Sequence, residues 1–453
     1  MQIERFPTPG LGDHTYLLAH DGLGVVIDPQ RDIERFRDAA AAANVEVRAV
    51  VETHLHNDYV SGGPQLALHA GADLVLPAAA GATYRYRPAF HGEAIELGSD
   101  LTLLPWHTPG HTPEHTSYVV LIGGEPVAVF TGGSLLVGSA GRTDLLGEQR
   151  ADQLARLQHG SLQRLAGLPG GVGVYPTHGE GSFCAATGAD RTVSDIDTER
   201  SLNPALAHDD PDGFARWQRQ GLQPYPAYYA RMGPANLAGG GPMPDPATPT
   251  LDVDAIDRLA DRVELIDIRE RHDAAEGHIP GSHLVSLGED FGVWAGWLID
   301  LDAPVALVAD AGDDVTDAVV QLGRIGIDDV RGVLPIDAWR RAGRPLASMK
   351  TASVDEVAGA ISTESTDRVL DVRSPGEAAA EGLPGAVHRY VPDLAGDAGR
   401  WLPLDPEPYV VCASGRRAAI AAGLLARRGY RPVAVLDGGV AEVLAARPSQ
   451  PGT

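Results

Sequence analysis

The stretch at residues 52–63, "ETHLHNDYVSGG", places two histidines and an aspartate at alternate positions, directly after an apolar run that ends at Val51. An apolar run followed by a polar segment predicts a buried strand that ends in a loop. In an extended segment alternate side chains point to the same side, so His54, His56 and Asp58 can converge. Histidine nitrogens and carboxylate oxygens suit zinc or non-haem iron. The stretch therefore predicts a metal site where a strand ends.

Two further segments place a histidine at the same kind of position. Segment 107–118, "HTPGHTPEHTSY", offers His111 after a strand and a Pro-Gly turn. Segment 174–184, "VYPTHGEGSFC", offers His178 after another apolar strand. Three strand-to-loop histidine sites indicate one shared centre rather than scattered surface histidines.

Composition limits the class of protein. The chain has 453 residues, 43% of them hydrophobic, which predicts two to four domains with sizeable cores. Its formal net charge of −25 argues against nucleic acid or an anionic membrane surface as partner. No signal peptide is visible, and no apolar run approaches the ~20 residues of a membrane span. The two cysteines, Cys184 and Cys412, form no disulfide framework, so we expect a cytoplasmic protein. The sequence does not decide whether the protein forms a homo-oligomer.

An internal repeat follows the Gly/Pro-rich run at 238–250. Segment 264–285 matches segment 368–390, and segment 305–327 lies over segment 409–430 without gaps. Each copy alternates strands with helices, which predicts a parallel α/β sheet. The predicted domains are residues 1–240, 251–345 and 352–453.

The first predicted domain has a different pattern. Strands in 15–28 and 115–132 are typical of antiparallel hairpins with Gly-containing turns. Helical stretches at 32–45 and 150–168 lie between them. An α/β sandwich suits this mixture, with ligand groups on the loops that follow strands. The fold class is therefore α/β throughout.

The first domain resembles the metallo-β-lactamase superfamily, and more narrowly its persulfide dioxygenase and glyoxalase II branch. The residues that carry the resemblance are "THLHNDY", "TPGHTPEHTSY", "FTGGSLLVGSAGRTDL" (130–145), "YPTHG" and "RSLNP" (200–204). The resemblance implies an αββα sandwich in which His54, His56 and His111 form one metal site. It assigns Asp58 and His178 to a second position. Persulfide dioxygenases of this family use a single iron held by two histidines and one aspartate.

Two positions depart from the family pattern. Tyr59 stands where the family has the last histidine of H-x-H-x-D-H, which disfavours a binuclear hydrolase centre. Gly133 stands where the family has the aspartate of "FTGD" and brings no ligand. We expect Gly133→Asp to restore a carboxylate ligand and raise iron affinity if the loop keeps its path.

Three outcomes follow for the metal. His56 completes a three-histidine face with His54 and His111, or Asp58 swings in, or the site holds metal weakly or not at all. The expected cofactor is one non-haem Fe²⁺, with Zn²⁺ as the alternative.

Both copies of the repeat resemble the rhodanese homology domain. The motifs are "LIDIRE" and "VLDVRS", "HIPGSH" and "GLPGAVH", and "LDGGVAEV" (436–443). In the second copy the loop "CASGRRA" puts Cys412 between a strand and a helix, where backbone N–H groups and the helix N-terminus stabilise a thiolate or persulfide. Arg416 and Arg417 add positive charge for an anionic donor such as thiosulfate.

The first copy lacks this thiol. The gapless alignment puts Ala309 opposite Cys412, and a one-residue slip would put Asp310 there. Asp313 and Asp314 make the loop negative. We expect this copy to form no persulfide and to pack, space or dock its active neighbour.

Cys184 has two interpretations. It is either a small apolar residue in a turn, or a second thiol near the metal that receives or relays sulfane sulfur.

The expected function is sulfur metabolism. A low-mass thiol persulfide would be oxidised to sulfite at iron, and Cys412 would move sulfane sulfur between a persulfide, sulfite and thiosulfate. One alternative is a glyoxalase II-type thioester hydrolase with two metals. Another is a rhodanese sulfurtransferase whose degenerate metal domain only binds a sulfur carrier. The sequence leaves the thiol carrier unidentified.

Overall fold

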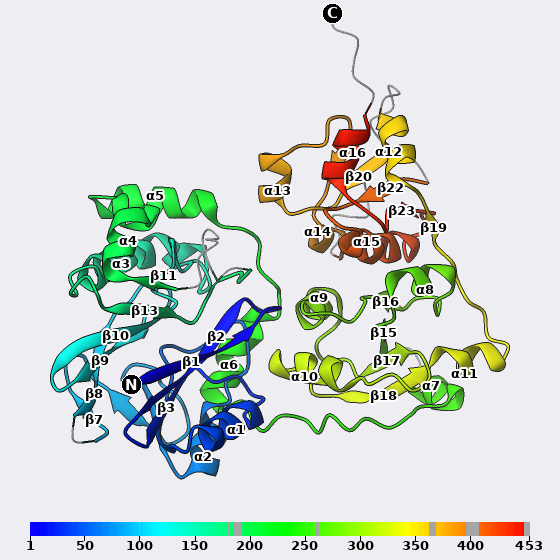
Figure 1. Cartoon of the computed structure of the whole chain (residues 1–453). Helices are drawn as coiled ribbons and strands as arrows, with labels where there is room; N and C mark the ends of the chain where they lie inside the picture. The colour runs from blue at the N-terminus through cyan, green and yellow to red at the C-terminus, as the bar shows by residue number, and fades with distance from the viewer. Residues whose placement is uncertain are drawn as a thin grey trace, which may run out of the picture. The chain divides into compact units, whose positions relative to one another are not determined.

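The computed structural model divides the chain into two compact units (Figure 1). The N-terminal unit is Met1–Pro244 with Leu322–Gly326, and the C-terminal unit is Asp245–Gln321 with Ile327–Thr453. The division after Pro244 falls inside the predicted linker at 238–250. The structure describes residues 1–98, 100–179, 181–184, 193–259, 262–361, 368–395 and 407–447.

Two six-stranded sheets form the N-terminal unit. The first sheet runs, in spatial order, β1 (Gln2–Thr8), β2 (Asp13–His20), β3 (Leu23–Ile27), β4 (Glu46–Val51), β5 (Asp73–Pro77) and β6 (Arg87–Ala89). The second runs β14 (Ser194–Asp195), β13 (Gly173–Pro176), β10 (Glu125–Gly132), β9 (Thr116–Ile122), β8 (Leu101–His107) and β7 (Ile95–Glu96). The predicted hairpins are present as the antiparallel pairs β2–β3 and β9–β10.

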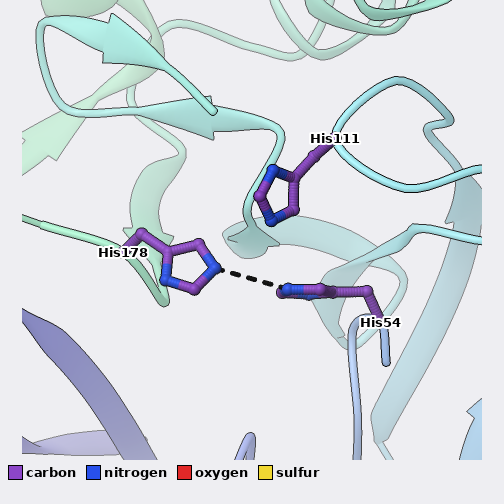
Figure 2. A group of neighbouring side chains, drawn as sticks. All are labelled: His54, His111 and His178. Carbon is purple, nitrogen blue, oxygen red and sulfur yellow. Dashed lines mark hydrogen bonds between the residues drawn. The ribbon is translucent and has the colours of Figure 1, made fainter. Parts of the chain in front are cut away.

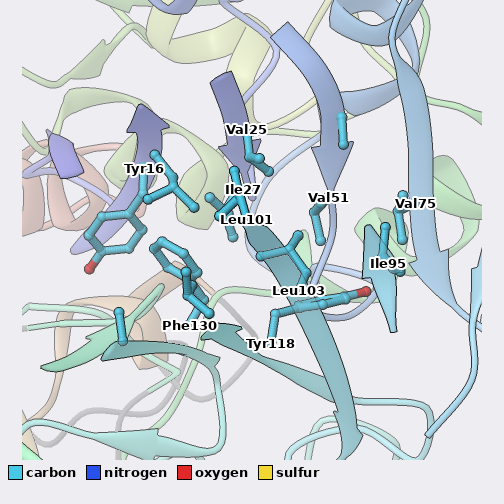
Figure 3. Packing of buried hydrophobic residues seen from close by; sticks show 14 of the residues in the cluster. Tyr16, Val25, Ile27, Val51, Val75, Ile95, Leu101, Leu103, Tyr118 and Phe130 are labelled. Atoms are coloured by element: carbon cyan, nitrogen blue, oxygen red, sulfur yellow. The ribbon is translucent and has the colours of Figure 1, made fainter. Parts of the chain in front are cut away.

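The main core lies between these sheets (Figure 3). Val25, Ile27 and Val51 of the first sheet pack with Tyr118 and Phe130 of the second. Neighbouring strand residues face the other way, because side chains alternate along a strand. Each sheet is therefore buried on both faces and needs a second covering layer.

Helices supply that layer. On the first sheet, Phe36 and Leu66, from α1 (Glu34–Ala42) and α2 (Gly63–Ala70), pack against Val26. On the second, Leu162 and Phe214 belong to the outer core of α3 (Glu148–Leu165) and α5 (Pro211–Gly221). The predicted αββα sandwich is confirmed. The remaining elements are β11 (Leu135–Leu136), β12 (Ser139–Ala140), α4 (Ile196–Leu202), η1 (Pro204–Ala207) and α6 (Tyr229–Ala238).

The C-terminal unit contains two parallel sheets, one for each copy of the repeat. The first is β16 (His283–Leu284), β15 (Glu264–Asp267), β17 (Val305–Ala309) and β18 (Val330–Pro335). The second is β21 (Val387–His388), β20 (Val369–Asp371), β22 (Tyr409–Val411), β23 (Val433–Ala434) and β19 (Lys350–Thr351). The strand order is the same, and an isolated parallel bridge from Thr250 to Val333 takes the place of β19.

Helices follow the strands in the same order in both copies. The first copy has α7 (Val253–Leu259), α8 (Arg271–Glu276), α9 (Phe291–Leu298), α10 (Thr316–Arg324) and α11 (Ile336–Arg341). The second has α12 (Val354–Ile361), α13 (Pro375–Ala380), α14 (Val391–Ala395), α15 (Arg416–Ala426) and α16 (Val440–Ala446). Among the described residues no helix combines the length and hydropathy that crossing a bilayer requires.

Register relates the two copies residue by residue. Asp267 lies opposite Val308 in the first sheet, and Asp371 lies opposite Val411 in the second. The next residues, Ala309 and Cys412, therefore occupy equivalent positions at the ends of β17 and β22, which favours the gapless alignment over the one-residue slip.

Candidate metal centre and sulfur-transfer loop

Three buried histidines meet at one end of the sandwich (Figure 2). His54 follows β4, His111 lies between β8 and β9, and His178 follows β13. One ring nitrogen of each lies within 4.8 Å of the other two, and Nε2 of His54 is 3.3 Å from Nε2 of His178. We call these residues the three-histidine centre.

Hydrogen bonds at the far side of each ring orient the centre. Nδ1 of His111 is 2.8 Å from the carbonyl oxygen of Arg142, and Nδ1 of His178 is 2.8 Å from Oδ1 of Asp13. Nδ1 of His54 is 2.9 Å from Oγ1 of Thr53. Such partners direct Nε2 towards a shared point, as they do in metal sites.

Burial makes these imidazoles suitable as ligands. Burial and the neighbouring histidines hold the pKa of His54 and His111 well below the usual range, and burial also lowers the pKa of His178. The rings are therefore neutral and present lone pairs. Nε2 of His111 is buried without a hydrogen-bond partner among the described residues. Three neutral nitrogens with one of them unsatisfied fit a divalent metal such as zinc or iron.

His56 lies beside this centre, with its ring centroid 4.2 Å from that of His54, and its Nδ1 is buried without a hydrogen-bond partner among the described residues. The expectation that it completes a face with His54 and His111 therefore stays a prediction. Its Nε2 lies 3.0 Å from Oε2 of Glu52, 3.2 Å from Oδ1 of Asp28 and 3.0 Å from the hydroxyl of Tyr59. Although burial opposes the charged form, Asp28 and Glu52 raise the pKa of His56 well above its usual range. His56 also belongs to two further groups that could hold a metal ion, one with Asp28 and His54 and one with Asp58 and His178.

His178 is the third histidine of the three-histidine centre, and it also forms a candidate group with His56 and Asp58. The family resemblance implies a second metal position formed by Asp58 and His178. In the structure Oδ2 of Asp58 is 3.3 Å from Nδ1 of His178, on the side of the ring that faces Asp13. Burial and the neighbouring Asp13 raise the pKa of Asp58 to about 7. Oδ1 of Asp58 is buried without a hydrogen-bond partner among the described residues.

Cys184 lies beside the same carboxylate. Its Sγ is 3.5 Å from Oδ2 of Asp58 and 3.9 Å from the hydroxyl of Tyr229, and the side chain is fully buried. Burial, together with Asp58 and Asp13, raises the pKa of Cys184 well above its usual range. This environment favours a neutral thiol, which is a weak nucleophile.

The second candidate thiol, Cys412, lies at the end of β22 in a different environment. Its Sγ is 3.1 Å from the backbone N of Gly415 and 3.5 Å from that of Ser414. Gly415 has a φ of +88°, and a Cβ there would overlap the carbonyl oxygen of Leu436, so the turn requires glycine. The N–H groups and the start of α15 stabilise an anionic sulfur.

Both arginines of this loop are paired with carboxylates. Arg417 donates to both oxygens of Glu377, at 2.5 and 2.6 Å, and Arg416 is 2.6 Å from Oδ1 of Asp290. Although burial opposes it, the pairing with Arg417 lowers the pKa of Glu377 to about 2. From the sequence, both guanidinium groups were expected to be available to an anionic donor. In the structure Glu377 pairs with Arg417 and Asp290 pairs with Arg416.

Comparison with known proteins agrees with this organisation. The model of the Metallo-beta-lactamase superfamily matches residues 9–178, and that of the Rhodanese-like domain matches residues 353–446. The cytoplasmic hydroxyacylglutathione hydrolase of Arabidopsis thaliana is 32% identical over 187 residues, which are 39% of this chain and 67% of that protein. The chain belongs to the metallo-beta-lactamase superfamily. It carries a rhodanese-like domain after the superfamily domain.

Other relatives show the same pattern. The hydroxyacylglutathione hydrolase of Tolumonas auensis is 30% identical over 188 residues, and the match spans 39% of this chain but only 65% of that protein. A crystal structure described as a metallo-beta-lactamase from Staphylococcus aureus subsp. aureus COL has a TM-score of 0.67 at 26% identity. It covers 74% of this chain and 99% of its own, so the structural likeness extends beyond the superfamily domain.

Gly133 explains how this superfamily member arranges its histidines. A Cβ built on Gly133 would overlap Cδ2 of His111 and lie 2.7 Å from its Nε2. The N–H of Gly133 donates to Nε2 of His115 at 2.9 Å, which holds the backbone in place. The ring of His111 thus fills the space where a side chain at 133 would begin. The expectation that Gly133→Asp restores a ligand and raises iron affinity is therefore corrected.

Gly133→Ala and Gly133→Asp are both expected to weaken metal binding about tenfold or more, because any side chain there displaces His111. Competition with a chelator for Fe²⁺ or Zn²⁺ measures the affinity. Gly160→Ala is the matched control, since a Cβ at that helical position meets no atom within 4 Å. Tighter binding by Gly133→Asp, with Gly133→Ala weakened, would restore the original expectation.

Asp13 and Asp28 are the residues that motif analysis missed at this site. Asp13 orients His178, and Asp28 accepts from the backbone N of Thr53 at 2.6 Å beside the metal loop. The sequence signal for each is a carboxylate next to an apolar strand. Asp13 is the first residue of β2, and Asp28 directly follows β3.

Proposed function

We propose that this protein is a sulfur-metabolism enzyme. Its N-terminal unit oxidises a low-mass thiol persulfide to sulfite, and Cys412 transfers sulfane sulfur. The observation that carries the proposal is the pairing of two features in one chain. One is a three-histidine centre with no carboxylate at position 133, and the other is a thiol held by the backbone N–H groups of Ser414 and Gly415.

The residues that would hold a single Fe²⁺ are His54, His111 and His178. When bound, the iron would supply coordination sites for dioxygen and for the persulfide sulfur. The overall reaction consumes one persulfide, one dioxygen and one water, and releases the thiol, sulfite and two protons. Asp13 keeps His178 in the tautomer that presents Nε2, and the carbonyl of Arg142 does so for His111.

A pocket beside the centre offers room for the thiol carrier. Its volume is about 620 Å³, and its lining includes Leu55 and Thr112, which directly follow His54 and His111 in sequence. Tyr229 also lines it and contacts Cys184. A pocket of this size accommodates a low-mass thiol.

Cys412 would act by sulfur transfer. Its thiolate attacks the sulfane sulfur of thiosulfate, a new S–S bond forms, the old one breaks, and sulfite leaves with the bonding electrons. The N–H groups of Ser414 and Gly415 would then hold the terminal sulfur anion. A thiol, sulfite or cyanide that attacks this sulfur regenerates the thiolate. Sulfite made in the N-terminal unit is thus a chemically suitable acceptor for sulfur on Cys412.

The alternative is a glyoxalase II-type thioester hydrolase, which the names of the hydroxyacylglutathione hydrolase relatives favour. Such an enzyme needs two metals. Gly133 supplies no bridging carboxylate, and the hydroxyl of Tyr59 donates to the carbonyl of Asp28 at 3.1 Å. These features weigh against a second metal. In a third hypothesis only Cys412 is active and the N-terminal unit binds a sulfur carrier.

Metal analysis of protein purified without oxygen separates these functions. The proposal expects about one iron per chain and oxygen uptake with a low-mass persulfide. Two zinc ions per chain with thioester hydrolysis would establish the hydrolase, and a metal-free parent would leave the sulfurtransferase alone.

The first copy of the repeat is proposed to be a rhodanese-like domain without chemistry. Ala309→Cys in a Cys412→Ser background is expected to show less than about 1% of the parent's transferase activity, although Ala309 has the position of Cys412. In the second copy backbone N–H groups of the loop face the sulfur of Cys412. In the first copy the backbone N–H of Asp310 instead donates to Oδ2 of Asp313 at 3.1 Å. The carboxylates repel anionic donors.

Production of thiocyanate from thiosulfate and cyanide measures this activity, with Cys412→Ser alone as the control. Recovery above about one tenth of the parent rate would show that the position of the thiol matters more than the charge of the loop.

A further inference from the structure

Asp290, from the first copy of the repeat, engages the sulfur-transfer loop of the second. Its Oδ1 lies 2.6 Å from Nη2 of Arg416, the first residue of α15. Its Oδ2 accepts from the indole Nε1 of Trp294 at 3.0 Å, which fixes the carboxylate. Both charged side chains are more than one third exposed, at 38% for Arg416 and 39% for Asp290. The guanidinium of Arg416 is thus open to solvent but already paired with a carboxylate.

Gly288 provides the surface on which that guanidinium rests. A Cβ at Gly288 would overlap Nη2 of Arg416 and lie 3.1 Å from its Cζ. Gly288 has no positive φ, so alanine fits its backbone. The flexible end of Arg416 is what would have to move. The ion pair thus depends on a glycine as well as on a carboxylate.

Further contacts hold the first copy beside this loop. Nε of Arg271 donates to the carbonyl of Leu436 at 3.0 Å, and Nε2 of His272 is 3.0 Å from Oδ1 of Asp437. The segment that begins with Leu436 and Asp437 continues to Val440, whose N–H donates to the carbonyl of Cys412 at 2.9 Å. Asp290 is therefore part of a contact that reaches the edge of the Cys412 loop, and not an isolated surface charge.

The charges of the loop consequently cancel. Glu377 neutralises Arg417 from within the second copy, and Asp290 neutralises Arg416 from the first. A dianion such as thiosulfate gains little electrostatic attraction from two cations that are already paired. A donor with one negative charge or none loses less attraction through this pairing. The attraction lost scales with the charge of the donor.

We propose that Asp290 is a specificity-determining residue that disfavours dianionic sulfane donors at Cys412, so that the site selects singly charged or uncharged persulfides. This inference rests on the proposed sulfur transfer by Cys412. It also gives a role to the first copy of the repeat, which has alanine at the position of the thiol.

The test compares two donors that react through the same S–S bond. Thiosulfate carries two charges and methanethiosulfonate carries one, and both transfer their terminal sulfur to Cys412 as sulfite or sulfinate leaves. Asp290→Asn is expected to raise kcat/KM about tenfold for thiosulfate and about threefold for methanethiosulfonate at low ionic strength. The gain should shrink at high salt, because the charges are exposed. Asparagine still accepts the hydrogen bond from Trp294.

Gly288→Ala tests the same pair without changing any charge. It should shift the donor preference in the same direction, because it moves Arg416 off Asp290. Gly359→Ala is the matched control, since a Cβ at that position in α12 meets no atom within 4 Å. The double variant Asp290→Asn with Arg416→Gln should lose the gain, since it removes the cation that Asp290→Asn frees.

Equal changes for the two donors, or none, in an active Asp290→Asn enzyme would overturn the inference while leaving the proposed function standing. A parent that makes no thiocyanate from either donor would overturn the proposed sulfur transfer, and the inference with it.

Discussion

Cys412→Ser is expected to lower thiosulfate sulfurtransferase activity at least about a thousandfold while leaving the fold intact, because the reaction needs a sulfur nucleophile at the loop. No other residue can replace it. Cys184 is buried beside Asp58, where its pKa is raised, and the equivalent position in the first copy is Ala309. Serine fits the space of the thiol, so the N–H groups of Gly415 and Ser414 keep their positions.

Thiocyanate production measures the loss, and circular dichroism checks the fold. Ser414→Ala is the control, because Ser414 contacts Sγ through its backbone N, which alanine retains. Its activity should stay within about threefold of the parent. If Cys412→Ser kept a tenth or more of the activity, the assignment of the sulfur-transfer site would fail.

His178→Ala is expected to weaken metal binding by about a hundredfold or more, as are His54→Ala and His111→Ala. Each change leaves only two histidines of the three-histidine centre, too few to hold a divalent metal tightly. His56→Ala should weaken it less, because Nε2 of His56 is engaged by Glu52 and Asp28.

Chelator competition and metal per chain measure these effects, with the exposed His69→Ala on α2 as the control. The comparison between His178 and His56 decides the ligand set. Loss of metal from His56→Ala with retention in His178→Ala would move the centre to the neighbouring group formed by Asp28, His54 and His56.

Local pattern was enough to predict the sandwich and the repeat. The apolar run before the metal loop became β4, which is buried at Val50 and Val51. The loops that follow strands bring His54, His111 and His178 together, as the pattern predicted. The equivalence of Asp267 and Asp371 likewise follows from similar segments that adopt similar strands.

Contacts between distant segments were beyond that pattern. Alternation along an extended segment predicted that His54 and His56 lie together, and their ring centroids are 4.2 Å apart. What it did not predict is that Asp28, from another strand, holds Nε2 of His56. The packing of His111 on Gly133 depends on how two loops approach each other. Position and hydrophobicity along the chain contain no signal for such contacts.

The approach of His111 to Gly133 also bears on how this centre can change by mutation. The family resemblance leads one to expect aspartate at position 133, yet that side chain would collide with the ring of His111. A carboxylate ligand at this position therefore requires at least one further change that moves the ring of His111. A carboxylate at position 133 and His111 in its present place therefore exclude each other.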